Sequence, residues 1–170
     1  MAAETFDPVL LSRAIFEESN RVRVEHGLQE LAHMNALDAA AGEQATYLAL
    51  SQTIGHESSF PKEHNLGERI THVGLTASHA SENAIRMPIR RPEEEAMRNY
   101  TYAEYATFLV DGWMNSPSHS ANLLDPRVNF LGCAARLSRG IVHGDSTVYA
   151  TQVFYVKIEK EIEVFSVKHW

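Results

Sequence analysis

The sequence has a single cysteine, Cys133, and this scarcity limits the covalent chemistry of the chain. Because there is no second cysteine, no disulfide can form within the chain, and the redox compartment is left open. Cys133 lies in the apolar, strand-like run Phe130–Ala135. We therefore expect a buried structural cysteine rather than a nucleophile.

The chain also lacks a long apolar run and an excess of positive charge. No stretch approaches the roughly 20 apolar residues that a membrane-spanning helix needs, and we find no signal peptide. The start Met1-Ala2-Ala3-Glu4 would suit a chain from which a leader has been removed. The 15 Lys and Arg are outnumbered by 22 Asp and Glu, so the net charge is −7. Phosphate recognition requires clustered Lys and Arg, and we expect no nucleic-acid partner.

The length and composition favour one domain over residues 1–170. A chain of 170 residues with 44% hydrophobic content can bury a conventional core. A first helix is predicted from Pro8 to His26, since Asp7 can cap it and Gly27 can end it. One face of this helix is apolar, with Leu11, Ile15 and Val22. A second helix is predicted from Asn35 to about Leu50.

The middle of the chain is less regular. Residues 52–92 are predicted to be mostly loop, with a short helix near residues 66–73. Thr101 and Glu104 then form a capping-box pattern, which predicts a helix reaching Trp113. The Ser116-Pro117 pair ends that helix and precedes a second short helical run.

The last third of the sequence changes to a period typical of strands. Val128–Leu137 and Thr147–Glu159 are predicted as two strands, joined by a hairpin turn at His143-Gly144-Asp145. The alternating tail Glu161–Val167 is predicted as an edge strand. Helices followed by an antiparallel sheet indicate an α+β layered domain.

Two histidines and a carboxylate, from three separate segments, form the candidate site. His56, Glu82 and His119 could together bind zinc, with water as a fourth ligand. Alternatively, Glu82 could orient one imidazole or act through a bound water. A third possibility is that the histidines bond to the backbone and Glu82 to a helix end, which would leave a pocket without chemistry.

Other hydrolase patterns are incomplete in this sequence. His56-Glu57 begins like a zincin helix, but Phe60 stands where the second histidine belongs. There is no Gly-x-Ser-x-Gly elbow. Ser116 and Ser118 lie close to His119, but no Asp or Glu is evidently placed to orient that imidazole.

Several short motifs follow one another in a fixed order. They are Asn20-Arg21, Gly27-Leu28, Asn35, His56, Ser81-Glu82-Asn83-Ala84, the segment Trp113–Leu124, Gly132-Cys133 and Tyr149–Phe154. In this order they resemble the CAP superfamily of cysteine-rich secretory proteins, antigen 5 and pathogenesis-related 1 proteins, and more closely its bacterial secreted, SCP-like members. Ser81–Ala84 is similar to the family's Gly-Glu-Asn-Ile motif. Trp113–Leu124 is similar to the segment that carries Ser-Pro-Gly-His-Arg.

The resemblance implies a three-layer α-β-α sandwich with a small antiparallel sheet. The domain core would cover about residues 9–157, with 158–170 as a C-terminal extension or edge strand. The family's central cavity usually carries two histidines and two glutamates, and His56, Glu82 and His119 would be three of these four. Ser116 occupies the position of the second glutamate. Further residues expected to line the cavity are Asn83, Ser116, Asn122 and Gln152.

The resemblance also implies a secreted, periplasmic or cell-envelope protein. We expect a binding module for a small ligand, a lipid, a metal or a protein partner rather than an enzyme, with zinc as the candidate cofactor. One alternative is a zinc-dependent hydrolase in which Glu82 activates water. Another is an envelope protein that interacts through its surface, with the cavity vestigial.

Overall fold

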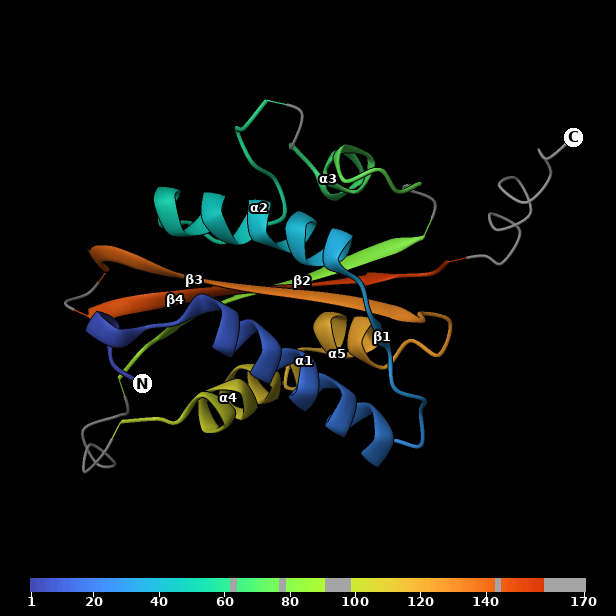
Figure 1. Ribbon diagram of the computed structural model, residues 1–170, viewed down its shortest axis with the longest axis horizontal. Helices are drawn as coiled ribbons and strands as arrows, with labels where there is room; N and C mark the ends of the chain where they lie inside the picture. Colours follow the sequence, from blue (N-terminus) through green and yellow to red (C-terminus); the bar gives the residue numbers. More distant parts are fainter. Residues whose placement is uncertain (62–63, 77–78, 91–98, 143–144, 158–170) are drawn as a thin grey trace, which may run out of the picture.

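The computed structural model describes residues 1–61, 64–76, 79–90, 99–142 and 145–157, which form three layers (Figure 1). The helices are α1 (Pro8–Glu25), α2 (Asn35–Ser51), α3 (Leu66–His72), α4 (Tyr102–Met114) and α5 (Pro117–Leu123), preceded by a short 3-10 turn at Ala3–Thr5. The strands are β1 (Ala32–His33), β2 (Ala80–Pro88), β3 (Phe130–Val142) and β4 (Asp145–Tyr155).

The central layer is a sheet with the strand order β1-β3-β4-β2. β4 pairs antiparallel with both β3 and β2. β1 adds a two-residue parallel pair with β3. The prediction of an α+β sandwich is confirmed, with the one difference that β1 makes the sheet mixed rather than purely antiparallel.

Helices cover both faces of the sheet (Figure 1). α2 and α3 lie on one face, and α1, α4 and α5 lie on the other. The larger apolar core lies on the α1 side and includes the fully buried Ile15, Tyr105, Leu109, Trp113 and Phe154. Burial of this apolar surface stabilises the folded state by roughly 25 cal/mol for each Å² removed from water. No described helix is both long enough and apolar enough to cross a membrane.

The predicted helix boundaries rest on local capping groups that the structure confirms. The Asp7 carboxylate accepts hydrogen bonds from the backbone N–H groups of Val9 at 2.8 Å and Leu10 at 3.1 Å. Gly27, just after the first helix, has φ +74°. The capping box of Thr101 and Glu104 at the start of α4 is complete in both directions. These interactions are short-range, so the sequence alone could predict them.

The prediction of a mostly irregular segment over residues 52–92 is wrong for Ala80–Pro88, which forms β2. The strand is difficult to recognise because both of its faces are covered and three of its first four residues are polar. Glu82, Asn83 and Ala84 are all buried, so the usual alternation of apolar and polar residues is absent. The pairing with β4, about 70 residues away in sequence, stabilises the strand.

The two C-terminal strands are confirmed with shifted ends. β3 runs to Val142 and β4 begins at Asp145, and these two residues pair with each other. Residues 143–144 of the predicted turn lie outside the described residues, as does the segment 158–170 with its predicted edge strand.

Cys133 is buried in β3, as expected, with 2% of its surface exposed. Burial first, and then the nearby negative charge of Asp38, raise the pKa of its thiol well above the ordinary value. A neutral thiol is a poor nucleophile, so a structural role fits this position.

Candidate functional site

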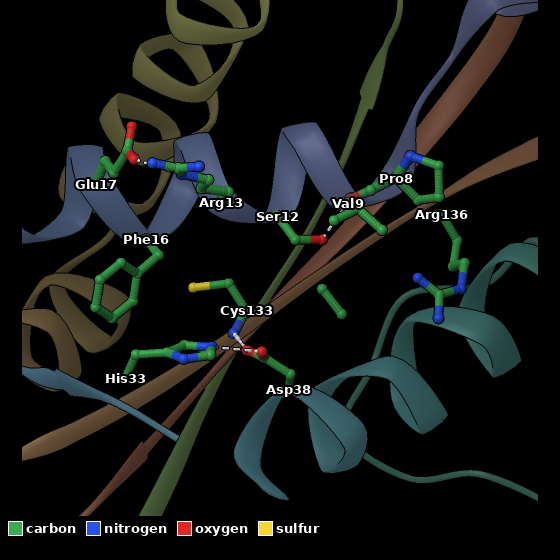
Figure 2. A pocket seen from close by; sticks show the side chains of 11 residues that line it. Pro8, Val9, Ser12, Arg13, Phe16, Glu17, His33, Asp38, Cys133 and Arg136 are labelled. Atoms are coloured by element: carbon green, nitrogen blue, oxygen red, sulfur yellow. Dashed lines mark hydrogen bonds and ion pairs between the residues drawn. The ribbon is translucent and has the colours of Figure 1, made fainter. Parts of the chain in front are cut away.

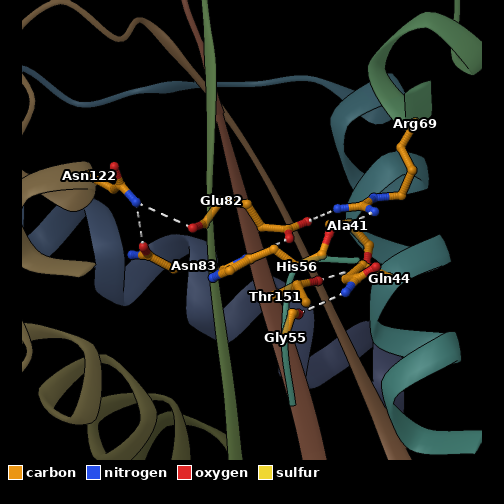
Figure 3. A network of polar contacts seen from close by, with 9 residues as sticks. All are labelled: Ala41, Gln44, Gly55, His56, Arg69, Glu82, Asn83, Asn122 and Thr151. Atoms are coloured by element: carbon orange, nitrogen blue, oxygen red, sulfur yellow. Dashed lines mark hydrogen bonds and ion pairs between the residues drawn. The ribbon is translucent and has the colours of Figure 1, made fainter. Parts of the chain in front are cut away.

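The carboxylate of Glu82 is the centre of a polar cluster on β2 (Figure 3). Its side chain is only 2% exposed. Oε1 lies 3.0 Å from Nδ1 of His56, and Oε2 accepts a hydrogen bond of 2.6 Å from Nη2 of Arg69. Both carboxylate oxygens therefore have partners within the protein.

Arg69 is a member of this cluster that the sequence analysis missed. It comes from α3, and its side chain is fully buried. Besides its bond to Glu82, it donates from Nη1 to the backbone oxygen of His56 at 3.4 Å. Arginine is seldom buried unless it is paired, and the sequence gives no sign that this one is. The only signal is its place within the predicted short helix.

His56 lies in the segment after α2 and is held from three sides. Nε2 of Gln44 donates to the oxygen of Gly55 at 2.8 Å, Arg69 binds the oxygen of His56, and Glu82 binds its ring. The side chain of His56 is 54% exposed. Because Nδ1 faces the carboxylate, Nε2 is the ring nitrogen through which His56 would meet a ligand.

A second polar network lies on the other side of β2. Since side chains alternate along a strand, Asn83 points away from Glu82 toward the face covered by α5. Nδ2 of Asn83 donates to Oε1 of Gln152 at 3.1 Å and to the backbone oxygen of His119 at 3.0 Å. Nδ2 of Asn122 donates to Oδ1 of Asn83 at 2.9 Å and lies 3.3 Å from the oxygen of Glu82. These bonds fix the position of α5 against β2.

His119 reaches the site from α5, whose first residue is Pro117. β2 is the edge strand of the sheet, and the two histidines lie on elements on either side of it. Burial of the ring, followed by the charge of His56, lowers the pKa of His119. The structure thus joins His56 directly to Glu82, and the His119 backbone to Asn83.

The predicted cavity residues differ in their placement. Asn83 and Gln152 are fully buried, whereas Asn122 is half-buried. Ser116 is the residue before α5, and its hydroxyl lies 3.4 Å from that of Ser118. No hydrogen bond within the described ranges joins Ser116 to Glu82 or to either histidine. In that part of the chain, no three His, Cys, Asp or Glu side chains form a group that could hold a metal ion.

The pKa values of the two histidines are shifted in opposite directions from the ordinary value of 6.5. The hydrogen bond to Glu82 raises the pKa of His56, although burial and the charge of Arg69 oppose it. His56 therefore makes its full contribution to the free energy of unfolding below pH 6.5. This contribution is lost as the pH rises through the pKa of His56 in the folded protein. For His119, whose pKa is lowered, the contribution is complete above pH 6.5 and is lost as the pH falls through its folded pKa.

An NMR titration of the imidazole protons measures both values. We expect the pKa of His56 to lie above that of His119, and Glu82→Gln to lower the pKa of His56. A His56 that titrates at the same pH in wild type and in Glu82→Gln would contradict the assignment of the carboxylate as its partner.

Comparisons with known proteins give one family match and several solved structures of similar fold. The model of the cysteine-rich secretory protein family, CAP, matches residues 16–154. A search of curated proteins found no match. A solved extracellular protein from Bacillus anthracis that contains an SCP domain is similar with a TM-score of 0.63 and 23% identity, over 88% of this chain and 41% of that one.

Two further solved structures share the fold. An outer surface protein from Borrelia burgdorferi has a TM-score of 0.58 and 18% identity, over 85% of this chain and 92% of that one. A cysteine-rich secretory protein from Staphylococcus aureus has a TM-score of 0.56 and 18% identity, over 90% of this chain and 40% of that one. The chain thus spans about two fifths of the Bacillus and Staphylococcus proteins and nearly all of the Borrelia protein.

Proposed function

Because the chain belongs to the cysteine-rich secretory protein family, we propose that it is a ligand-binding module in which His56 and His119 hold a divalent metal ion such as zinc. Glu82 orients His56 in this proposal and does not act as a base. The observation that carries the proposal is the pair of hydrogen bonds of the Glu82 carboxylate, to His56 at 3.0 Å and to Arg69 at 2.6 Å.

Two properties of the imidazoles support this proposal. The lowered pKa of His119 favours its neutral form, which is the form that binds metals. The bond from Nδ1 of His56 to a carboxylate is the arrangement that fixes the tautomer of a metal-binding imidazole. The buried guanidinium of Arg69 neutralises Glu82, so this carboxylate is better suited to orienting His56 than to binding the cation itself.

A metal with only two protein ligands would bind a partner through its remaining positions. Zinc usually takes four ligands, so water or atoms of the bound molecule would supply the others. The protein's own contribution is to hold His56 between α2, α3 and β2, and to hold α5 with His119 against the edge of the sheet.

The burial of Glu82 disfavours the hydrolase alternative. A general base must contact the attacking water, because it accepts a proton from that water. The Glu82 side chain is only 2% exposed, and Ser116 stands where the family's second glutamate would be. The binding module needs Glu82 only to hold His56, whereas the hydrolase would need this buried carboxylate to reach water.

The location proposed for this module is outside the cytoplasm, either secreted or at the cell envelope. The support comes from the family's description as secretory and from the Bacillus and Borrelia proteins, which are described as extracellular and outer surface proteins.

Calorimetric titration of zinc into the chelator-stripped protein tests the metal site. We expect one zinc per wild-type chain and no stoichiometric binding in the His56→Ala, His119→Ala double variant. Glu82→Gln should weaken binding by about 10- to 100-fold, as expected for a residue that orients a ligand.

His72→Ala is the matched control for this titration. Nδ1 of His72 lies 3.0 Å from Glu43, and its side chain is 51% exposed, close to the values for His56. Zinc binding should persist in this variant. Equal binding by wild type and the double variant would refute the metal site, and peptidase or esterase activity that Glu82→Gln abolishes would refute the non-catalytic function.

A further inference from the structure

A cavity lies at the β1–β3 edge of the sheet, the edge opposite Glu82 and β2, between α1 and α2 (Figure 2). Its volume is about 570 Å³, within the range of sites that take small organic molecules. Phe16 and His33 lie at one end and Arg136 at the other. None of the residues of the polar cluster around Glu82 lines this cavity.

The floor of this cavity is the β3 edge beyond its short pairing with β1. The backbone N–H of Cys133 donates to Oδ1 of Asp38 at 2.9 Å, and that of Ala135 donates to Oγ of Ser12 at 3.1 Å. An added peptide strand would have to displace these side chains to reach the edge. The cavity is therefore better suited to a small molecule than to a peptide strand.

The charged side chains of the wall leave one cation without an acidic partner. Arg13 pairs with Glu17 at 2.8 Å, and His33 pairs with Asp38 at 2.5 Å. Arg136 instead donates to two neutral acceptors, the backbone oxygen of Ala135 at 2.8 Å and Oγ1 of Thr46 at 3.2 Å. Within the ranges that the structure describes, no carboxylate forms an ion pair with it. In a chain of net charge −7, this is an unusual position for a cation.

A glycine in the middle of α2 makes room for this guanidinium. A Cβ added at Gly42 would lie 3.3 Å from Nη2 of Arg136, tighter than most contacts of that kind. Glycine weakens a helix interior, but here it lets the guanidinium approach the helix backbone. Arg136 is thus held in place before any ligand arrives, which favours binding.

We propose that this cavity binds a small organic carboxylate with an apolar, preferably aromatic, body. The carboxylate pairs with Arg136, since guanidinium and carboxylate form strong charge-assisted hydrogen bonds. The body lies along Pro8 and Val9 toward Phe16, whose ring meets that of His33 edge-on at 5.4 Å between centroids. This site is independent of the metal site proposed for His56 and His119.

Binding of 2-naphthoate, measured by calorimetry and by NMR amide shifts, tests the proposal. The wild type should bind 2-naphthoate at least about tenfold more tightly than the neutral 2-naphthamide. Arg136→Gln should remove that difference, and Arg136→Lys should retain part of it. The amide signals of Ser12, His33 and Cys133 should shift on binding.

Arg21→Gln provides the matched control, because Arg21 lies on the same helix outside the cavity and is paired with Glu18 and Glu25. Its affinity for 2-naphthoate should stay within about twofold of wild type. Three results would each overturn the proposal. They are an equal loss of affinity in the two glutamine variants, an equal affinity of the wild type for 2-naphthoate and 2-naphthamide, and amide shifts confined to residues around His56. If Arg136→Gln fails to fold, the acid–amide comparison and the shift positions in wild type still decide the matter.

Discussion

Gly132→Ala is expected to destabilise the protein by about 3 kcal/mol or more. Gly132 lies in β3, where the first turn of α2 crosses it. A Cβ at this position would lie 2.2 Å from the carbonyl carbon of Leu37 and 2.4 Å from the nitrogen of Asp38. Because both of these are backbone atoms, no side-chain rotation can relieve the clash. The helix would have to move away from the sheet.

Urea denaturation followed by far-ultraviolet circular dichroism measures this effect. Gly55→Ala is the matched control, since a Cβ there would have nothing within 4 Å. Its unfolding midpoint should remain close to that of wild type. If Gly132→Ala were as stable as Gly55→Ala, the close packing of α2 on β3 would be incorrect.

Arg69→Met should destabilise the protein by about 3–5 kcal/mol, because it leaves a buried charge without its partner. The Glu82 side chain is 2% exposed, and Arg69 supplies its 2.6 Å hydrogen bond. The methionine fills the space of the aliphatic chain but leaves Oε2 without a donor. The remaining partner, His56, is half-exposed and cannot replace a buried guanidinium.

A second ion pair in the chain serves as the control. Arg127 pairs with Asp125 at 2.7 Å, but its side chain is 79% exposed. Arg127→Met should change the urea midpoint very little. Adding Glu82→Gln to Arg69→Met should recover part of the lost stability, since it removes the uncompensated charge. Equal midpoints for Arg69→Met and Arg127→Met would show that the buried pair does not stabilise the fold.

The predictable part of the fold depends on interactions between residues close in sequence. Asp7 caps α1, and Thr101 and Glu104 cap α4, within three residues of the groups they bind. β2 depends instead on its pairing with β4, far along the chain, and its buried polar residues conceal the alternation that marks a strand. β1 has only two residues, too few for any pattern.

The sequence supplied candidate residues for the site but could not supply their contacts. His56, Glu82 and His119 come from three segments, so only the resemblance to a family connected them. The structure adds Arg69, whose burial depends on how α3 packs beside β2. Without this residue, Glu82 would appear free to act as a base. With it, the carboxylate belongs to an ion pair.

The position of β4 affects when the domain can fold during synthesis. β4 is the last described strand in sequence, yet it lies between β3 and β2. Until β4 has left the ribosome, β2 has no neighbouring strand among the described strands. The sheet on which the buried ion pair of Glu82 and Arg69 depends is then still incomplete. Contacts between such distant segments form slowly. The sheet can therefore be completed only after β4 has emerged from the ribosome, so folding of this domain is completed late in its synthesis.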